Sequence, residues 1–219
     1  MFKEILIDTW HRKELFTFFE KFENPTWDIA AEVSVQRFYD ATKKVNASFF
    51  LSFLYVATKV ANSIDAFRQR IDSSGSVIEF DVIHAGSTIL YENETFGFGY
   101  FHYQEDFREF MNAAKTEFEK QKEKSDVDPK DEDLARLYFS PIPWISFSSF
   151  RHPYRKDANH SVPLIVFGKH FQTSHDRMMS VGLTLHHGLA DGYHAGLFFN
   201  RLQEALNAPE QYVNLPEFV

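Results

Sequence analysis

The sequence predicts one domain of the α+β or layered α/β class that spans residues 1–219. Helix-like and strand-like segments mix irregularly along the chain, which favours this class. No internal repeat and no domain boundary is visible. The length of 219 residues, the 44% apolar content and the 25 phenylalanines supply a substantial core.

Helices are predicted where apolar residues recur every three or four positions. They span residues 10–22, 35–45, 50–64, 106–122 and 192–206. In the first helix, Leu15, Phe18, Phe19 and Phe22 form the expected inward face.

Strands are predicted where apolar and polar residues alternate, or where short apolar runs end in turn residues. They span residues 27–35, 76–83, 88–91, 95–103, 138–140, 145–150, 163–171 and 177–187. Glu92-Asn93-Glu94 is expected to form a hairpin turn. Residues 122–133 are charged, contain Pro129 and are expected to form a mobile surface loop.

The composition excludes several classes of protein. A net charge of -8 argues against nucleic-acid binding, although a few local cations could still hold an anionic cofactor. The chain has no cysteine, so disulfides, thiolate metal sites and a thiol nucleophile are excluded. No apolar run reaches the ~20 residues of a membrane span, and the N-terminus has no signal-peptide pattern. We therefore expect a cytoplasmic protein.

The segment 185–192, Leu-His-His-Gly-Leu-Ala-Asp-Gly, is the strongest indication of chemistry. Strand alternation places His187 on the face of the preceding apolar residues and His186 on the other face. A neutral, buried imidazole is suited to general-base catalysis. Two alternatives remain. His187 could be an ordinary core histidine, or the histidines, with His194 nearby, could bind a metal. Neighbouring strand residues point apart, which argues against the metal site.

Arg12 is the second indication. On the first predicted helix it shares a face with Leu15 and Phe19, which carries its guanidinium toward the core. A buried arginine needs a partner, and Asp191 is the candidate. In the alternative reading, Arg12 lies at the surface over Leu15, and Asp191 caps the last helix.

These residues resemble a known family. His186-His187-Gly188-Leu189-Ala190-Asp191-Gly192 is similar to the HHxxxDG signature of the type-A chloramphenicol acetyltransferases. Residues 10–16 are similar to that family's W-x-R-[RK]-E-x-F, residues 140–144 to its S-x-x-P-W, and residues 193–203 to its closing helix. The DHRxxDG variant of the dihydrolipoamide acyltransferase cores matches less well.

The resemblance implies a two-layer fold, a mixed sheet flanked by helices, and acetyl transfer from acetyl-CoA to a hydroxyl within a ternary complex, with no metal. His187 would be the general base, its second nitrogen held by backbone, and Ser140 would stabilise the oxyanion. Asp191 would pair with Arg12 and fix the loop that carries His187. The family also implies a homotrimer with active sites between subunits.

The implied substrate pockets match the family less closely. Phe19 stands where a tyrosine is usual, Phe96 matches an expected phenylalanine, and Phe98 replaces a small residue. Val166 replaces a threonine, and His152 stands near an expected leucine. The lost hydroxyls and the added bulk predict that chloramphenicol is a poor substrate. For coenzyme A, Trp144 and Lys169 are the candidates, with Lys59 a weaker one.

Three rival functions remain open. The first is the same transfer to another hydroxyl acceptor. The second is a non-catalytic protein that binds a ligand on the same scaffold. The third is a metal hydrolase that uses the histidines.

Overall fold

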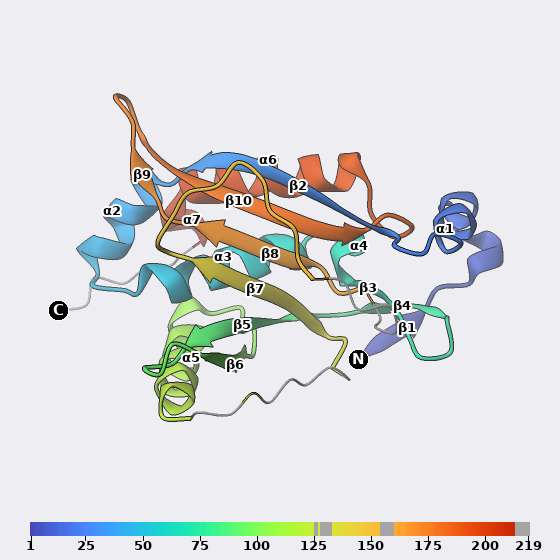
Figure 1. Ribbon diagram of the computed structural model, residues 1–219, viewed down its shortest axis with the longest axis horizontal. Helices are drawn as coiled ribbons and strands as arrows, with labels where there is room; N and C mark the ends of the chain where they lie inside the picture. The colour runs from blue at the N-terminus through green and yellow to red at the C-terminus, as the bar shows by residue number, and fades with distance from the viewer. Residues whose placement is uncertain (125–126, 128–132, 154–159, 213–219) are drawn as a thin grey trace.

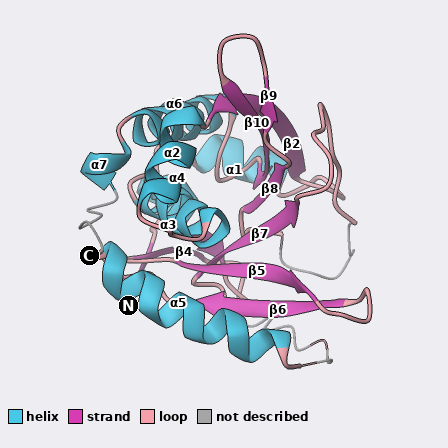
Figure 2. Ribbon diagram, turned by 90° about the vertical axis from the view of Figure 1, so that its left-hand side faces the viewer, coloured by secondary structure: helices cyan, strands magenta, loops and turns pink. Residues whose placement is uncertain are grey.

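The computed structural model describes residues 1–124, 127, 133–153 and 160–212 (Figure 1). It contains a large mixed sheet, a small antiparallel sheet and a layer of helices. Figure 2 shows most of the helices on one side of the large sheet. The predicted class, a mixed sheet flanked by helices, is confirmed.

The large sheet holds the candidate site residues. Its strand order is β2-β10-β8-β7-β5-β6, and β9 pairs with β10 beside it. The pairs β7–β8 and β5–β7 are parallel, and the other pairs are antiparallel. The bounds are β2 Thr26–Ser34, β5 His84–Leu90, β6 Phe96–Phe101, β7 Arg136–Ile142, β8 Leu164–Gly168, β9 Phe171–Gln172 and β10 Arg177–His186.

The small sheet was not predicted, apart from its central strand. It has the order β1-β4-β3, with bounds β1 Phe2–Glu4, β4 Val77–Phe80 and β3 Gln69–Ile71. The strands β1 and β3 have three residues each, too few for a pattern to show in the sequence. The short elements η1 Ile7–Thr9, α4 Asp65–Arg68 and α7 Pro209–Tyr212 escaped prediction for the same reason.

Most of the helices cover one face of the large sheet and bury the core, whereas the first lies beyond one end of the sheet (Figure 1). Their bounds are α1 Lys13–Phe19, α2 Gln36–Lys44, α3 Phe49–Asn62, α5 Phe107–Lys122 and α6 Gly192–Asn207. Side chains of Ser48, Asp106 and Asp191 accept backbone N–H bonds at the starts of α3, α5 and α6, which fixes where these helices begin. On β10, Val181, Leu183 and Leu185 point into this core, as the alternation predicts.

The prediction of a strand at residues 145–150 is wrong. This segment, which we call the strap, crosses the opposite face of the sheet. The amide of Lys169 donates to the carbonyl of Ile145 (2.8 Å), and the ring of Phe150 occupies the space where a side chain of Gly182 would lie. Two glycines, Gly168 and Gly182, let the strap approach the strands so closely.

The first helix is shorter than predicted, and its apolar stripe is not buried. α1 begins at Lys13, and Leu15, Phe18 and Phe22 are 44%, 56% and 48% exposed. Phe16 is the buried residue of the helix. The predicted loop at residues 122–133 lies largely outside the described residues. In the part of the chain that is described, no helix has the length and apolarity needed to cross a bilayer.

Candidate active site

The segment 185–192 forms the turn that joins β10 to α6. β10 ends at His186, and the amide of His187 donates to the carbonyl of Pro25 (2.8 Å). The amides of Leu189 and Ala190 both donate to the carbonyl of His186. These bonds leave His187 at the tip of the strand, just outside the ladder.

Two aromatic rings hold the imidazole of His187. The ring of Phe19 stacks on it, with 4.0 Å between ring centres and 7° between planes. The indole of Trp27 lies 5.3 Å away, and its Nε1 donates to the carbonyl of Ala190 (3.1 Å). The Nδ1 atom of His187 is buried and has no hydrogen-bond partner among the described residues. The backbone hydrogen bond that the resemblance implies for this nitrogen is therefore not found.

The two adjacent histidines differ in burial, and in the opposite sense to the prediction. His186 is 6% exposed, whereas His187 is half-buried. Alternation assigned His187 to the buried face, but the strand ends one residue earlier and the backbone turns. Burial lowers the pKa of His186 to about 4, so that imidazole is neutral at pH 7.

The predicted ion pair is present. Arg12 Nη1 donates to Asp191 Oδ2 at 2.9 Å, and the arginine is 6% exposed. The other oxygen of Asp191 lies 2.9 Å from His194 Nδ1 and accepts the amide of Tyr193. Burial acts to raise the pKa of Asp191, but the bonds from Arg12 and His194 outweigh it and lower the pKa to about 2. Asp191 is thus both the partner of Arg12 and the N-cap of α6.

Strand register brings several other predicted residues into one row. Phe98 pairs with Thr88 across β6 and β5, and Ser140 pairs with Val166 across β7 and β8. Because Ser87 lies opposite Phe139, Thr88 lies beside Ser140, and all four side chains share the face away from the helices. Thr88 is a hydroxyl in this row that the sequence reasoning missed, since nothing in the sequence shows which strand neighbours Ser140.

A pocket of about 790 Å³ opens beside this row. Ser140, Thr88, Phe96, Trp144 and Lys169 all line it, and most of its wall is apolar. Val166 is almost fully buried within the sheet and does not line the pocket. Lys59 pairs with Glu105 at 3.6 Å and is also not part of the wall.

Cations gather around Lys169 and His170 of the pocket wall. Arg177 Nη1 lies 3.0 Å from His170 Nδ1, and the guanidinium stacks on Tyr39 at 4.2 Å from the ring centre. Lys43 lies 5.5 Å from the same ring. Lys169 is exposed. A chain of net charge -8 thus concentrates positive charge beside an apolar pocket.

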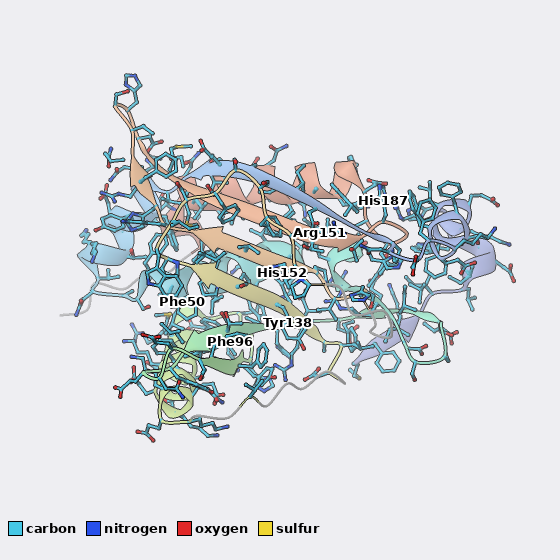
Figure 3. All side chains as sticks on the ribbon, in the orientation of Figure 1. Phe50, Phe96, Tyr138, Arg151, His152 and His187 are labelled. Carbon is cyan, nitrogen blue, oxygen red and sulfur yellow. The ribbon has the colours of Figure 1, made fainter. Side chains whose placement is uncertain are left out.

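His187 and Ser140 lie far apart within one chain. Ser140 of β7 pairs with Val166 of β8, which pairs with Gly182 of β10, so Ser140 and Gly182 lie two strand spacings apart. His187 follows Gly182 by five residues along the chain. Strand spacings of ~4.8 Å and rises of ~3.3 Å per residue place them roughly 20 Å apart. Figure 3 shows the same separation, with His187 at one end of the sheet and Phe50 and Phe96 of the pocket toward the other. One chain therefore carries the two candidate residues at separate places, which we call the His187 half-site and the Ser140 half-site.

The remaining residues add two observations. His152 follows the strap, is half-buried, and its Nε2 has no partner among the described residues; burial lowers its pKa. In the described part of the chain, no three His, Cys, Asp or Glu residues gather as metal ligands would.

The chain is similar to known proteins over nearly its whole length. The family described as chloramphenicol acetyltransferase matches residues 1–203. A chloramphenicol acetyltransferase of Staphylococcus aureus is 30% identical and covers 97% of this chain and 99% of its own. A solved chloramphenicol acetyltransferase is 33% identical, with a TM-score of 0.89 over 94% of this chain and all of that chain. A dihydrolipoamide acetyltransferase of Azotobacter vinelandii shares the fold at 15% identity, with a TM-score of 0.69 over 90% and 87% of the two chains.

Proposed function

The chain belongs to the chloramphenicol acetyltransferase family, and we propose that it transfers an acetyl group from acetyl-CoA to a hydroxyl of chloramphenicol or of a similar small molecule. The family identifies it as an acyltransferase, for which acetyl-CoA is the cosubstrate. The observation that carries the detailed proposal is the pair of half-sites, one with an imidazole and one with a hydroxyl beside an apolar pocket.

His187 acts as the general base. Its Nε2 removes the proton of the acceptor hydroxyl, whose oxygen attacks the thioester carbonyl. The Ser140 hydroxyl donates to the oxyanion that forms, a contribution of roughly 2.7–4 kcal/mol for one such donor. The tetrahedral intermediate then releases the thiolate of coenzyme A, which takes the proton from His187. No covalent enzyme intermediate is needed, in keeping with a chain that has no cysteine.

Stacking on Phe19 and contact with Trp27 fix the plane of the imidazole, since its Nδ1 has no partner within the described residues. Asp191 cannot orient the imidazole of His187, because Arg12, His194 and the amide of Tyr193 occupy both of its carboxylate oxygens. Its role is to hold the turn, and it does so through the Arg12 pair and the α6 cap.

The 790 Å³ pocket is the proposed site of acetyl-CoA. Its apolar wall, which includes Trp144, suits the pantetheine arm, and Ser140 lies where the thioester would end. Lys169 and the neighbouring Arg177 supply positive charge for the phosphates, and His170, whose pKa is lowered by burial and by Arg177, adds a neutral imidazole to the wall. Trp144 and Lys169 are thereby the cofactor-binding residues of the proposal.

The separation of His187 from Ser140 supports a site built by two copies of the chain. In such an arrangement His187 of one copy faces the row around Ser140 of the next. Exposed Leu15, Phe18 and Phe22 lie on the same segment as Phe19, and an apolar patch beside a half-site is typical of a surface that a partner covers. We propose the homotrimer of the family as the assembly.

The side chains expected to contact the acceptor favour a second candidate, the same transfer to a different hydroxyl. Phe19, Phe96 and Phe98 present no hydroxyl to an acceptor, and Val166 is buried within the sheet. Phe98 adds a half-buried ring to the row beside Thr88. A polar antibiotic would leave its own groups unpaired against these side chains. An acceptor with fewer polar groups suits them better.

One assay tests both candidates. Purified protein, acetyl-CoA and each of a panel of alcohols, chloramphenicol among them, are mixed and thiol release is followed. We expect turnover with at least one alcohol, and slower turnover with chloramphenicol than with a less polar acceptor. Absence of turnover with every alcohol, together with calorimetric binding of acetyl-CoA, would refute the enzymatic proposal in favour of a binding protein.

A further inference from the structure

A second cavity, of about 470 Å³, shares no lining residue with the 790 Å³ pocket. Its walls come from the N-terminal segment, from residues 63–66, from β3 and β4, and from the first turns of α6. Nothing in the acyl-transfer proposal uses this space.

Two residues that line the cavity carry buried polar atoms that lack partners among the described residues. Arg12 and Gln69 both line it and are only 6% and 5% exposed. Arg12 uses Nη1 for Asp191, but its Nε and Nη2 have no partner among the described residues. The Oε1 atom of Gln69 has none either. Buried donors and acceptors left unpaired are costly, so a site that collects three of them is suited to a ligand.

The unpaired atoms define what that ligand must offer. The Nε and Nη2 atoms of an arginine point two N–H bonds in parallel, a geometry that matches the two oxygens of a carboxylate or a phosphate. The carbonyl oxygen of Gln69 requires a donor instead. The matching ligand therefore carries both an oxyanion and a hydroxyl or similar donor.

The charges around the cavity favour an anion. Lys3 and Arg201 line it beside Arg12. The carboxylate of Glu79 is already engaged, since it lies 3.2 Å from Lys3 Nζ, 3.3 Å from Arg68 Nη2 and 3.2 Å from Gln69 Nε2. Asp65 pairs with Arg68 at 2.6 Å. The two acids of the wall are thus paired, and Arg12 is paired with Asp191 outside the wall. The remaining positive charge is that of Arg201, whose Nη1 donates to the carbonyl and the hydroxyl of Ser63.

We propose that this cavity binds a small oxyanion that also carries a hydrogen-bond donor, on the free Nε–Nη2 edge of Arg12 and the carbonyl of Gln69. The ligand reaches these buried atoms as the rim side chains rotate, of which His11 and Tyr193 are exposed. Because Arg12 also pairs with Asp191, an occupied site stabilises the turn that carries His187.

Calorimetric titration of the full chain with two matched pairs of probes tests the proposal. Inorganic phosphate carries a hydroxyl near neutral pH and sulfate does not; glycolate carries one and acetate does not. We expect phosphate or glycolate to bind with saturation, and more tightly than its partner. The pair that shows the effect identifies the phosphate or the carboxylate as the preferred anion.

Substitutions locate the binding. Gln69→Leu should weaken binding of the preferred probe by about tenfold or more. The variant should then bind the two probes of that pair with equal affinity. Lys3→Ala, at an exposed position, should weaken it severalfold without affecting the fold. The matched control is Lys169→Ala, which removes a cation of the other pocket and should leave this binding unchanged.

If Gln69→Leu does not fold, nuclear magnetic resonance of the unaltered protein reports binding at Arg12 directly. The Nε–H resonance of Arg12 should shift during titration of the unaltered protein. Four outcomes would each overturn the proposal. None of the four probes binds, or the two probes of each pair bind with equal affinity. Alternatively, the Arg12 resonance does not shift during titration, or Lys169→Ala abolishes the binding. No activity is measured, so none of these outcomes bears on acyl transfer.

Discussion

At the scale of single residues, His187 combines an accessible position with tight contacts. Its ring is half-buried, stacked on Phe19 and next to Trp27, so it can meet a substrate without swinging. The sequence indicated the residue through its distance from Asp191 and through family resemblance. It could not indicate the stack, because Phe19 comes from a helix 168 positions away in the chain and only tertiary packing brings the rings together.

Replacement of His187 by alanine tests the base. His187→Ala should lower acetyl-CoA-dependent thiol release by about 10²–10⁴-fold, since proton removal by a placed base contributes that much. The melting temperature should stay close to that of the unaltered protein, because the side chain is half-buried at a strand tip. The control is His175→Ala, at an exposed turn, which should change neither quantity. Undiminished turnover in His187→Ala would show that another group is the base.

The Arg12–Asp191 pair predicts an asymmetric loss of stability. Asp191→Asn leaves the buried guanidinium of Arg12 without a counter-charge, a change that costs about 3–5 kcal/mol when such a pair is broken. Arg12→Ala leaves a carboxylate that is more exposed and still bonded to His194, so its loss should be smaller. Urea denaturation measures both. Loss of activity in either variant without loss of stability would contradict the structural role of the pair.

The same pair predicts how stability varies with pH. The pKa of Asp191 falls from 3.8 to about 2 on folding, so its stabilisation is complete above the unfolded value and is lost as the pH falls through the folded one. The difference in free energy of unfolding between the unaltered protein and Asp191→Asn should be constant above about pH 5 and shrink between pH 4 and pH 2. A difference that stays constant to pH 2 would show that the carboxylate charge is not what matters.

At the scale of elements, most of the helices and strands were predictable because their patterns are long. α3, α5, α6 and β10 lie within a few residues of their predicted bounds. The strap was misjudged because alternating apolar residues predict a strand without showing whether a partner strand exists. The exposed stripe of α1 was misjudged for a related reason, since amphipathic spacing shows that a face is apolar and not whether this chain or another one covers it.

The contact between the strap and Gly182 can be tested by adding a side chain at Gly182. A Cβ atom at Gly182 would meet the ring of Phe150 at 2.0 Å, so Gly182→Ala must displace the strap. We expect a loss of about 1–3 kcal/mol from overpacking, together with weaker acetyl-CoA binding, because the strap follows Trp144. Adding Phe150→Ala makes room for the new methyl group, and the double variant should be less destabilised than the sum of the two single variants predicts. Simple additivity in denaturation experiments would contradict the contact.

At the scale of the whole molecule, His187 and Ser140 of one chain lie roughly 20 Å apart, so the proposed site needs two chains. The sequence indicated His187 and Ser140 separately, but their separation depends on strand order, which no pattern in the sequence reveals. The single domain over residues 1–219, the trimer and the cytoplasmic location stay predictions. The mixed sheet and the family membership are confirmed.

Complementation between two inactive variants tests the shared site. His187→Ala and Ser140→Ala proteins are unfolded together, mixed in equal amounts and refolded. If each site takes His187 from one chain and Ser140 from the next, about one site in four receives both intact, so about a quarter of the activity should return. Each variant refolded alone is the control. A mixture no more active than the two controls would show that the residues do not cooperate across chains.

The distance between the two half-sites also bears on hydrolysis of the thioester by a single chain. In a chain that has not yet assembled, acetyl-CoA would rest in a pocket from which the nearest proton acceptor of the proposed pair lies roughly 20 Å away. Water that reaches the carbonyl there lies far from His187 of the same chain, although His170 and Glu94 line the pocket. If His187 is the base for hydrolysis as well as for transfer, an unassembled chain should hydrolyse the donor slowly, and assembly of the proposed oligomer brings donor, base and alcohol together.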